Sequence, residues 1–566
     1  MKRHASMSSP SSRSFVRRRR PLPQTVAVLL VAGLLAAGCS TSANSQASSG
    51  TGAKSDTLTI VMPDTSITWS VDNGFGGLEP ANNLQATLLR KPYVPAKQAG
   101  TFQQDTYNYQ PYLAQGYTVS PDGLTYTFTL KDAKSAAGNT LNADDVIWSF
   151  ERKFATPTSV SPGILAPSIT DPAKQIKKID DRTVSFTLPQ AGLGTTFLAL
   201  CSDLLTQVYD ATLLKQHVTP ADPYAVKWST QNPNYGFGPY TVTNYQPGVS
   251  AVLTARDDWV LGPVPIKTIN LRIVADAGTR VNAVKNGDAD LAESVTPADS
   301  DALKSDPKVT VPQVENPNTY IMMPLLTNKA PFNNVDVRRA MAYATPYQQI
   351  VDNVYRGNAV RNGPGFLLKN APNYSDAGFP NYTYDPVKAK QILAAAGFPN
   401  GVSFGLAVSA ADPDTVQAAT QIQTEAKAAG FDIKIDQMPA AQFAVQRSDH
   451  SSQAFILRDY AITLTPPYEL LVYTAAGSSN NFSDWEYKPF YDALAAGNAL
   501  PNALSTEAGQ EWNKAEKIYL DQSPIVFIAQ VQPSVAYSSK VTGFAWRSDS
   551  WIDYSHLSFA GLTPSG

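Results

Sequence analysis

The chain has 566 residues, with 45 lysines and arginines against 47 aspartates and glutamates. Seven of the basic residues and none of the acidic ones precede Cys39, so the 528 residues from Cys39 onward carry 38 basic and 47 acidic residues, a net charge of −9. Such an acidic chain argues against nucleic acid or an anionic membrane surface as the partner. Its length is enough for roughly two to four domains.

The first 38 residues have the pattern of a secretory signal. Four arginines at 17–20 precede an apolar run at 26–38, which is shorter than the ~20 residues of a membrane-spanning helix. Cys39 follows Leu35-Ala36-Ala37-Gly38, which resembles a bacterial lipobox, although Ala36 stands where the tight form has Leu, Val or Ile. The resemblance implies that residues 1–38 are removed and that Cys39 carries the lipid (palmitate or another acyl chain). A plain secretory signal with a stray cysteine is the alternative.

The segment 39–55 is small and polar and should behave as a flexible linker. With the lipid on Cys39, it would hold the protein at the outer face of the cytoplasmic membrane, in a cell without an outer membrane (a Gram-positive bacterium). Cys201 is the only other cysteine, so no disulfide is expected within the lipidated chain. It follows the apolar run 197–200, and we expect it in the core.

Helices and strands are expected to alternate along the body. Strands are predicted at 58–61, 124–130 and 431–435, the second from its alternation of apolar residues with threonine. Helices are predicted after Asn142, after Asn334, from Thr345-Pro346 to Gly357, from Asp385-Pro386 to Gly397 and over 417–429. This order favours an α/β fold.

Several enzyme signatures are missing from the sequence. It contains no His-Glu-x-x-His, Walker A or Cys-x-x-Cys motif, and its histidines after Cys39 are scattered. We therefore expect no enzyme, no cofactor and no metal site. The 26 tyrosines and eight tryptophans favour packing, or a cleft that binds a flexible, partly polar ligand. An extracytoplasmic hydrolase and a purely structural envelope lipoprotein are the rival interpretations.

Several segments, in order, resemble one family. Tyr112-Leu113-Ala114 with 122–130, the helix 141–152, Gly236-Phe237-Gly238-Pro239-Tyr240, the turn 284–290, Pro331-Phe332-Asn333-Asn334 with 335–340, and 384–399 are similar to the large solute-binding proteins of ABC importers, of the dipeptide/oligopeptide type (family 5). Two stretches depart from the family pattern. Residues 135–138 lack its usual His-Asp-Gly, and 456–462 keep Asp-Tyr but lose a tryptophan and an acid-proline pair.

The resemblance implies an α/β fold with two lobes, like a type II periplasmic binding protein, with an extra inserted domain and a hinge between the lobes. The first lobe would comprise 56–85, 216–318 and 525–566, the inserted domain 86–215, and the second lobe 319–524. The protein would be a monomer that delivers its cargo to the permease subunits of an ABC transporter. The cargo would be an oligopeptide, or else another bulky solute such as an oligosaccharide or a metal chelate.

The resemblance also implies that Asp459 pairs with the α-amino group of a peptide. The ligand-binding candidates are Asp459, Tyr460, Asn481, Trp69, Tyr235 and Phe237. Five of the six have a plainer alternative: a surface acid for Asp459, loop-turn bonding for Asn481, and packing for the three aromatic residues Trp69, Tyr235 and Phe237.

Overall fold

The structure is a computed structural model, and it describes residues 56–63, 67–73, 79–157, 159–478, 480–549 and 552–562. The expected signal 1–38, the lipidation site Cys39 and the linker up to residue 55 lie outside the described residues. Among the helices that are described, none is both long and apolar enough to cross a bilayer.

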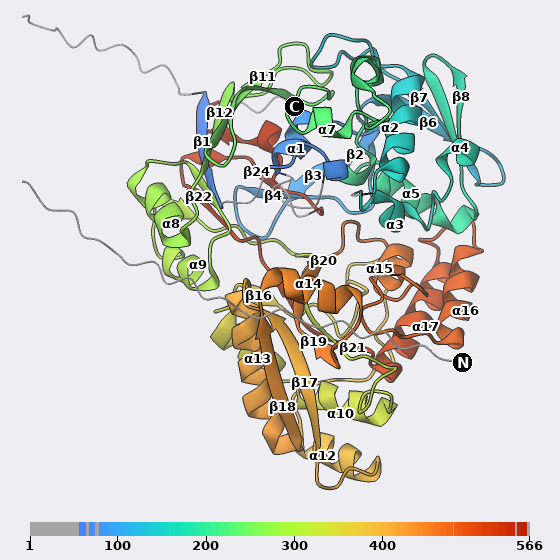
Figure 1. Ribbon diagram of the computed structural model, residues 1–566, viewed down its shortest axis with the longest axis vertical. Helices are drawn as coiled ribbons and strands as arrows, with labels where there is room; N and C mark the ends of the chain where they lie inside the picture. Colours follow the sequence, from blue (N-terminus) through green and yellow to red (C-terminus); the bar gives the residue numbers. More distant parts are fainter. Residues whose placement is uncertain are drawn as a thin grey trace, which may run out of the picture. The chain divides into compact units, whose positions relative to one another are not determined.

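The first lobe is built on a seven-stranded mixed sheet of order β10-β11-β12-β1-β13-β22-β14. Its strands are β1 (Thr57–Met62), β10 (Tyr240–Gln246), β11 (Ser250–Ala255), β12 (Thr268–Ile273), β13 (Leu291–Glu293), β14 (Val309–Thr310) and β22 (Val535–Ser538). β1 runs parallel to both of its neighbours, and Leu58 and Ile60 are fully buried. The predicted strand at 58–61 is thus confirmed. Helix α8 (Ala277–Asn286) packs against β13 and β22 (Figure 1).

The inserted domain contains a four-stranded antiparallel sheet of order β6-β7-β9-β8. Its strands are β6 (Ala114–Val119), β7 (Thr125–Leu130), β8 (Ile176–Asp180) and β9 (Thr183–Thr187). In β7, Phe128 and Leu130 are fully buried while Thr129 is exposed, which confirms the predicted alternation. Cys201 has no exposed surface and lies in the same core, as expected.

Helix α2 (Ala143–Ala155) begins where the sequence predicts. The Asn142 side chain accepts hydrogen bonds from the backbone amides of Asp144 (2.8 Å) and Asp145 (3.2 Å). The Asp145 carboxylate accepts in turn from the Asn142 amide (2.9 Å). This reciprocal cap satisfies backbone donors that the first turn leaves free.

The second lobe holds two sheets. One has the order β16-β21-β15-β20, and the other is β18-β17-β19. Their strands are β15 (Thr319–Pro324), β16 (Ala359–Val360), β17 (Val402–Ser409), β18 (Phe431–Met438), β19 (Ala454–Phe455), β20 (Leu457–Tyr460) and β21 (Ile525–Val531). β18 confirms the strand predicted at 431–435. The helices are α10 (Val335–Ala344), α11 (Tyr347–Gln349), α12 (Pro386–Ala395), α13 (Pro413–Ala426), α14 (Ala440–Ser448), α15 (Pro466–Val472), α16 (Lys488–Asn498) and α17 (Thr506–Gln522).

The helices of the second lobe match their predicted starts, with one difference. α10 and α12 begin after Asn334 and Asp385, whose side chains accept from Asp336 and Lys388 amides. α11 follows Pro346 and continues as a π-helical turn, Ile350–Val354. α13 begins at Pro413, four residues before the predicted 417, because Asp412 caps it through the Thr415 amide (3.3 Å). α13 packs on both β17 and β18, which run parallel (Figure 1).

Two expected domain boundaries are corrected by the strand pairing. β21 pairs with β15 and β16, so residues 525–531 belong to the second lobe and not to the first. β4 (Thr101–Gln104) pairs with β24 (Phe544–Trp546), and β3 (Tyr93–Pro95) pairs with β4, so both strands lie with the C-terminal part of the first lobe rather than in the inserted domain. Buried apolar runs such as Ile525–Val531 carry no signal of which sheet they join.

The chain crosses between the lobes between β14 and β15 and again between β21 and β22. The Gln532 side chain ties these two crossing segments together: its Oε1 accepts from the Val314 amide (2.9 Å) and its Nε2 donates to the Val314 carbonyl (3.1 Å). Gln532 is buried. The two crossings form the hinge region expected between lobes of this kind.

Candidate ligand-binding site

The site begins at strand β20, at the edge of its sheet. β20 pairs with β15 only, and Asp459 lies opposite Tyr320 near the end of the strand. The Asp459 Oδ1 atom accepts a hydrogen bond from the Tyr460 amide (2.8 Å). Past Tyr460 the chain leaves the sheet and leads into α15, so Asp459 stands where regular strand pairing ends.

Asp459 lines a cavity of about 530 Å³, which we call the charged cavity. The second lobe supplies Asp459, Tyr460 and the aromatic side chains Tyr468, Tyr473 and Phe482. The opposite wall comes from the inserted domain, from residues 159–164 at the start of α3 (Ser161–Leu165). The cavity is therefore a space enclosed between two parts of the molecule.

Two opposite charges face this cavity. Burial raises the pKa of Asp459 to about 6, although the hydrogen bond from the Tyr460 amide and the positive charge of Arg447 oppose that rise. Arg447 lies on α14 and also lines the charged cavity, with its guanidinium 5.3 Å from the centre of the Phe482 ring. At neutral pH the cavity thus presents a poorly solvated carboxylate and a guanidinium.

Tyr473 adds a hydroxyl group. Its Oη atom is buried and has no hydrogen-bond partner among the residues that the structure describes. Burial keeps the pKa of this phenol well above its usual value, so it remains a neutral donor. Because this atom has almost no exposed surface, it does not face the open space of the charged cavity.

An apolar extension of about 440 Å³ continues from the charged cavity. The two spaces share Gly163, Ile164, Tyr468 and Val472. Beyond them, the extension is lined by Ala166, Pro167, Leu471, Ala475, Ala476 and Gly477. Small apolar side chains of this kind leave room without offering specific polar contacts.

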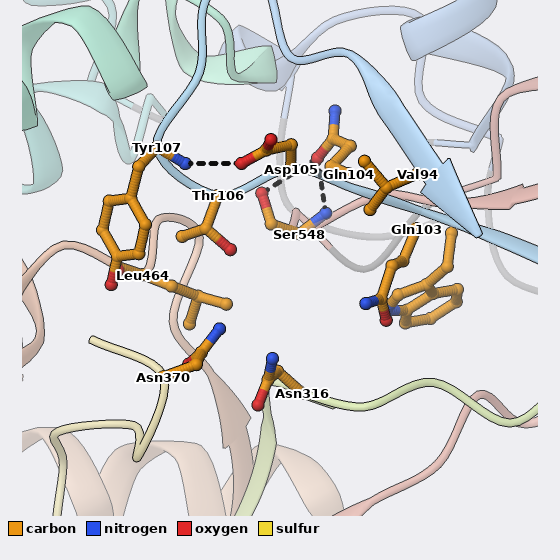
Figure 2. A pocket seen from close by; sticks show the side chains of 11 residues that line it. Val94, Gln103, Gln104, Asp105, Thr106, Tyr107, Asn316, Asn370, Leu464 and Ser548 are labelled. Atoms are coloured by element: carbon orange, nitrogen blue, oxygen red, sulfur yellow. Dashed lines mark hydrogen bonds between the residues drawn. The ribbon is translucent and has the colours of Figure 1, made fainter. Parts of the chain in front are cut away.

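A third space, which we call the amide cavity, also lies between the lobes. Its volume is about 270 Å³, and Figure 2 shows the side chains around it. Gln103, Gln104 and Thr106 come from the side of the first lobe, and Asn370 and Leu464 from the second lobe. Asn316 belongs to the crossing between the lobes.

Hydrogen bonds across the interface hold these spaces closed. The Tyr107 hydroxyl donates to the Leu464 carbonyl (3.1 Å), and the Thr196 and Thr465 hydroxyls lie 2.9 Å apart. The Asn318 amide donates to the carbonyls of Ala461 and Ser548, which belong to different lobes. The structure therefore shows a closed arrangement of the cleft.

The structure brings together only part of the predicted site. Asp459 and Tyr460 line the charged cavity, as expected of a binding pair. Asn481 lies between the lining residues Asn480 and Phe482, but its own side chain is buried and bonds the Trp485 backbone (2.9 and 3.2 Å). This is the loop-turn bonding that was its alternative.

The other three candidates are core residues. Tyr235 has no exposed surface and stacks edge-on against Tyr209 at 5.5 Å, in a cluster around Arg152. Phe237 is 1% exposed and belongs to the main core, and Trp69 is 1% exposed in the core of the first lobe. The structure does not bring them to Asp459, and an aromatic residue beside a Gly-Pro turn cannot be told from a core residue by sequence.

Several lining residues had no sequence signal. Arg447 sits on a helix with no motif, and residues 159–164 are distant in sequence from Asp459. For Tyr468 and Tyr473, the only available signal was that they lie close to Asp459 in the sequence. Among the described residues, no group of three or more His, Cys, Asp or Glu side chains is placed to hold a metal ion.

Two lobes are joined by a double crossing, with one cavity between them and another between the second lobe and the inserted domain. This is the architecture of a protein that binds a small solute between its parts. The family model for bacterial extracellular solute-binding proteins, family 5, matches residues 108–482. The chain belongs to this family. The predicted two-lobed, type II fold is confirmed by the solved structures that it resembles.

Relatives with different cargoes match the chain. It is 31% identical over 315 residues to the heme-binding protein A of Haemophilus influenzae, covering 53% of this chain and only 56% of that protein, about half its length. It is 26% identical to the dipeptide-binding protein of Escherichia coli, covering 78% and 85%. The structure of the Helicobacter pylori periplasmic binding protein DppA in complex with peptide STSA matches with a TM-score of 0.72 and 22% identity, covering 89% and 98%.

Proposed function

We propose that the protein is the extracytoplasmic receptor of an ABC importer, and that it captures short peptides in the charged cavity. The observation that carries this proposal is the half-buried Asp459 carboxylate, which lines a cavity between the second lobe and the inserted domain together with Arg447. A cation that enters the cavity restores the interactions that this carboxylate loses with water. The α-ammonium group of a peptide is such a cation.

The rest of the cavity suits a peptide as well. Arg447 lines the cavity and can bind a carboxylate. The aromatic walls can pack against varied side chains. About 530 Å³ lies within the usual range of roughly 300–1,000 Å³ for ligand sites. The apolar extension would accept a longer or bulkier side chain.

The similar proteins support a peptide as the cargo, and they also support the alternative of another solute. Dipeptide-binding proteins cover most of the chain, whereas the relative of highest identity given above is called heme-binding. The alternative is the same receptor role for another solute, such as an oligosaccharide or a metal chelate. A hydrolase is the less favoured alternative, because the family is one of receptors.

Calorimetry with a tripeptide and its N-acetylated form tests the proposal. We expect Asp459→Asn to weaken binding of the free tripeptide at least tenfold, because a charge-assisted hydrogen bond contributes about 1.5–3 kcal/mol. Asp432→Asn, which changes an exposed acid of the same lobe, is the matched control. Equal affinity of the wild-type protein for both forms of the tripeptide would show that Asp459 does not bind the amino group.

The lipid anchor is the second part of the proposal. A monomer held by acyl chains on Cys39 would stay near its permease while the linker lets it turn. Two acyl chains make anchoring stable where one is marginal. We expect Cys39→Ala to release the protein into the medium and abolish uptake with peptide affinity unchanged, whereas Cys201→Ala should stay on the membrane. Retention of the Cys39→Ala protein in the membrane fraction would contradict the anchor.

A further inference from the structure

A short segment of the inserted domain lies directly against the second lobe. It comprises a 3₁₀ turn (Ala191–Leu193) and helix α5 (Gly194–Leu200). A Cβ atom at Gly192 would lie 2.5 Å from the carbonyl oxygen of Asn498 and 2.6 Å from that of Leu500, closer than a side chain can approach. Glycine is therefore required for the two backbones to come this close. The two parts of the molecule are in backbone contact here.

The same segment forms a buried hydrogen bond to the second lobe. The hydroxyl oxygens of Thr196 and Thr465 lie 2.9 Å apart, and neither residue has any exposed surface. Among the residues that the structure describes, neither hydroxyl has another hydrogen-bond partner. Because both groups are shut off from bulk solvent, each depends on the other to compensate for its burial.

Thr465 occupies a position at which a threonine side chain normally bonds to its own helix. It is the N-cap residue of α15, yet its side chain makes no capping bond there. α9 (Pro297–Leu303) also begins with a threonine before a proline, but the Thr296 hydroxyl accepts from the Asp299 amide (3.1 Å). The first turn of α15 contains a second proline, Pro467, which has no N–H, so fewer amides there need a cap. The Thr465 hydroxyl is thus available for a bond outside its helix.

This bond joins the two walls of the charged cavity. α15 supplies Tyr468 and Val472 to the cavity, and the inserted domain supplies Ile164 on the opposite side. Thr465 immediately precedes α15, so a bond that fixes Thr465 to the inserted domain also fixes the helix that carries one wall. Since Thr196 belongs to the other wall's domain, the bond can form only while the two walls are together.

We propose that Thr196 and Thr465 are positioning residues that form a clasp, and that this clasp holds the inserted domain against the second lobe with or without cargo. When the two parts separate, the Thr465 hydroxyl would turn back to the Tyr468 amide, as that of Thr296 does at the start of α9. Opening then exchanges one hydrogen bond of Thr465 for another, while water replaces the bond that Thr196 loses. The clasp does not depend on the identity of the cargo, whereas its effect on the release of a peptide rests on the proposed function.

Distances between two spin labels test the clasp without any ligand. Labels on Lys174→Cys, in the inserted domain, and on Lys488→Cys, in the second lobe, replace exposed side chains. The Cys39→Ala background leaves Cys201 as the only other cysteine, and Cys201 is buried. Adding Gly192→Ala to this labelled parent protein supplies the distance of the open form, because the new methyl group would collide with two carbonyl oxygens of the second lobe.

The labelled parent protein should show a shorter distance that Gly192→Ala lacks. We expect Thr196→Val to reduce the ratio of the short to the long population between about fivefold and a hundredfold, because it leaves the Thr465 hydroxyl buried without a partner in the closed form only. Thr465→Val should reduce the ratio less, since it also removes the capping bond that stabilises the open form. Thr345→Val is the matched control: it removes a buried bond to the Met341 carbonyl (2.9 Å) inside the second lobe and should leave the ratio unchanged.

The same distances can overturn the proposal. If the parent protein shows only the distance of Gly192→Ala, or if Thr196→Val has no more effect than Thr345→Val, the two parts are not held together by the clasp and the proposal is wrong. Equal shifts from Thr196→Val and Thr465→Val would refute the exchange of hydrogen bonds at the start of α15.

Stopped-flow release of a tripeptide with a fluorescent last residue measures the effect on cargo. We expect Thr196→Val to release it between about fivefold and a hundredfold faster than the wild type, and Thr345→Val to release it at the wild-type rate. If the label distances respond as expected but no tripeptide binds, the clasp stands and the peptide cargo is wrong. If the tripeptide binds but Thr196→Val releases it at the wild-type rate, the peptide cargo stands and the clasp does not retain it.

Discussion

Replacing Glu516 by glutamine should change how the stability of the protein depends on pH. Glu516 lies on α17 and is 1% exposed, with Glu469, also 1% exposed, close enough to interact with it. Burial raises the pKa of Glu516 to about 8, although hydrogen bonds from the amides of Phe366 and Leu367 oppose the rise. The folded protein therefore keeps a proton on Glu516 at pH 7, whereas the unfolded chain, with a pKa near 4.5, does not.

The sign of the effect follows from this difference. Between about pH 4.5 and pH 8 the folded state binds more protons than the unfolded state, so the free energy of unfolding falls as the pH rises. Each pH unit in this window lowers it by about 1.4 kcal/mol, which gives roughly 3 kcal/mol between pH 5 and pH 7.5. A glutamine in place of Glu516 has no proton to lose.

Urea unfolding followed by tryptophan fluorescence, at several values between pH 5 and pH 8, measures the effect. We expect the Glu516→Gln protein to lack this loss and to gain about 3 kcal/mol on the wild type between pH 5 and pH 7.5. Glu507→Gln, an exposed position on the same helix, is the control and should leave the slope unchanged. Parallel pH profiles for the wild type and Glu516→Gln would show that Glu516 is ionised in the folded protein, and would refute the reasoning.

Three further predictions concern the cleft and the buried charges. Because the pKa of Asp459 is about 6, affinity for a peptide ammonium should fall about tenfold per pH unit below pH 6 in calorimetry, and the same titration of Asp459→Asn should be flat. Gln532→Ala should lower the free energy of unfolding measured with urea by about 2 kcal/mol, because it leaves the amide and carbonyl of Val314 without partners; no change would mean that the two crossings are held elsewhere. Lys91 and Asp203 form a fully buried ion pair at 2.8 Å, so either Lys91→Met or Asp203→Leu alone should cost about 3–5 kcal/mol, while the double variant should recover most of it; additive losses would contradict the pairing.

Short sequence patterns predicted most of the helix starts and the strands correctly. The caps Asn142, Asn334 and Asp385 mark true helix starts, because each side chain satisfies backbone amides that the first turn leaves free. α13 starts earlier than predicted because Asp412-Pro413 caps and opens it, as Asp385-Pro386 does for α12. It was harder to predict which sheet a strand joins. β21 is buried along its whole length, and such a strand fits either lobe.

The site was predictable only where a family motif marks it. Asp459 and Tyr460 belong to such a motif and do line the charged cavity. Tyr235 and Phe237 also belong to a motif, but that motif positions a turn, and their rings fill the core. Arg447 and the wall at 159–164 come close to Asp459 only after the lobes and the inserted domain pack together. No local sequence pattern predicts which distant segments will line the same cavity.

The wall formed by residues 159–164 also bears on how a protein of this kind can change its cargo. This segment precedes α3 and includes most of that helix, and it pairs with no sheet, whereas Asp459 is fixed by strand pairing. Substitutions in the segment can therefore reshape one side of the charged cavity while the carboxylate, its strand and the hinge stay as they are. On the proposed function, selectivity and capture would be carried by separate stretches of the chain, and descendants of one receptor could diverge in what they carry without losing the ability to close around it.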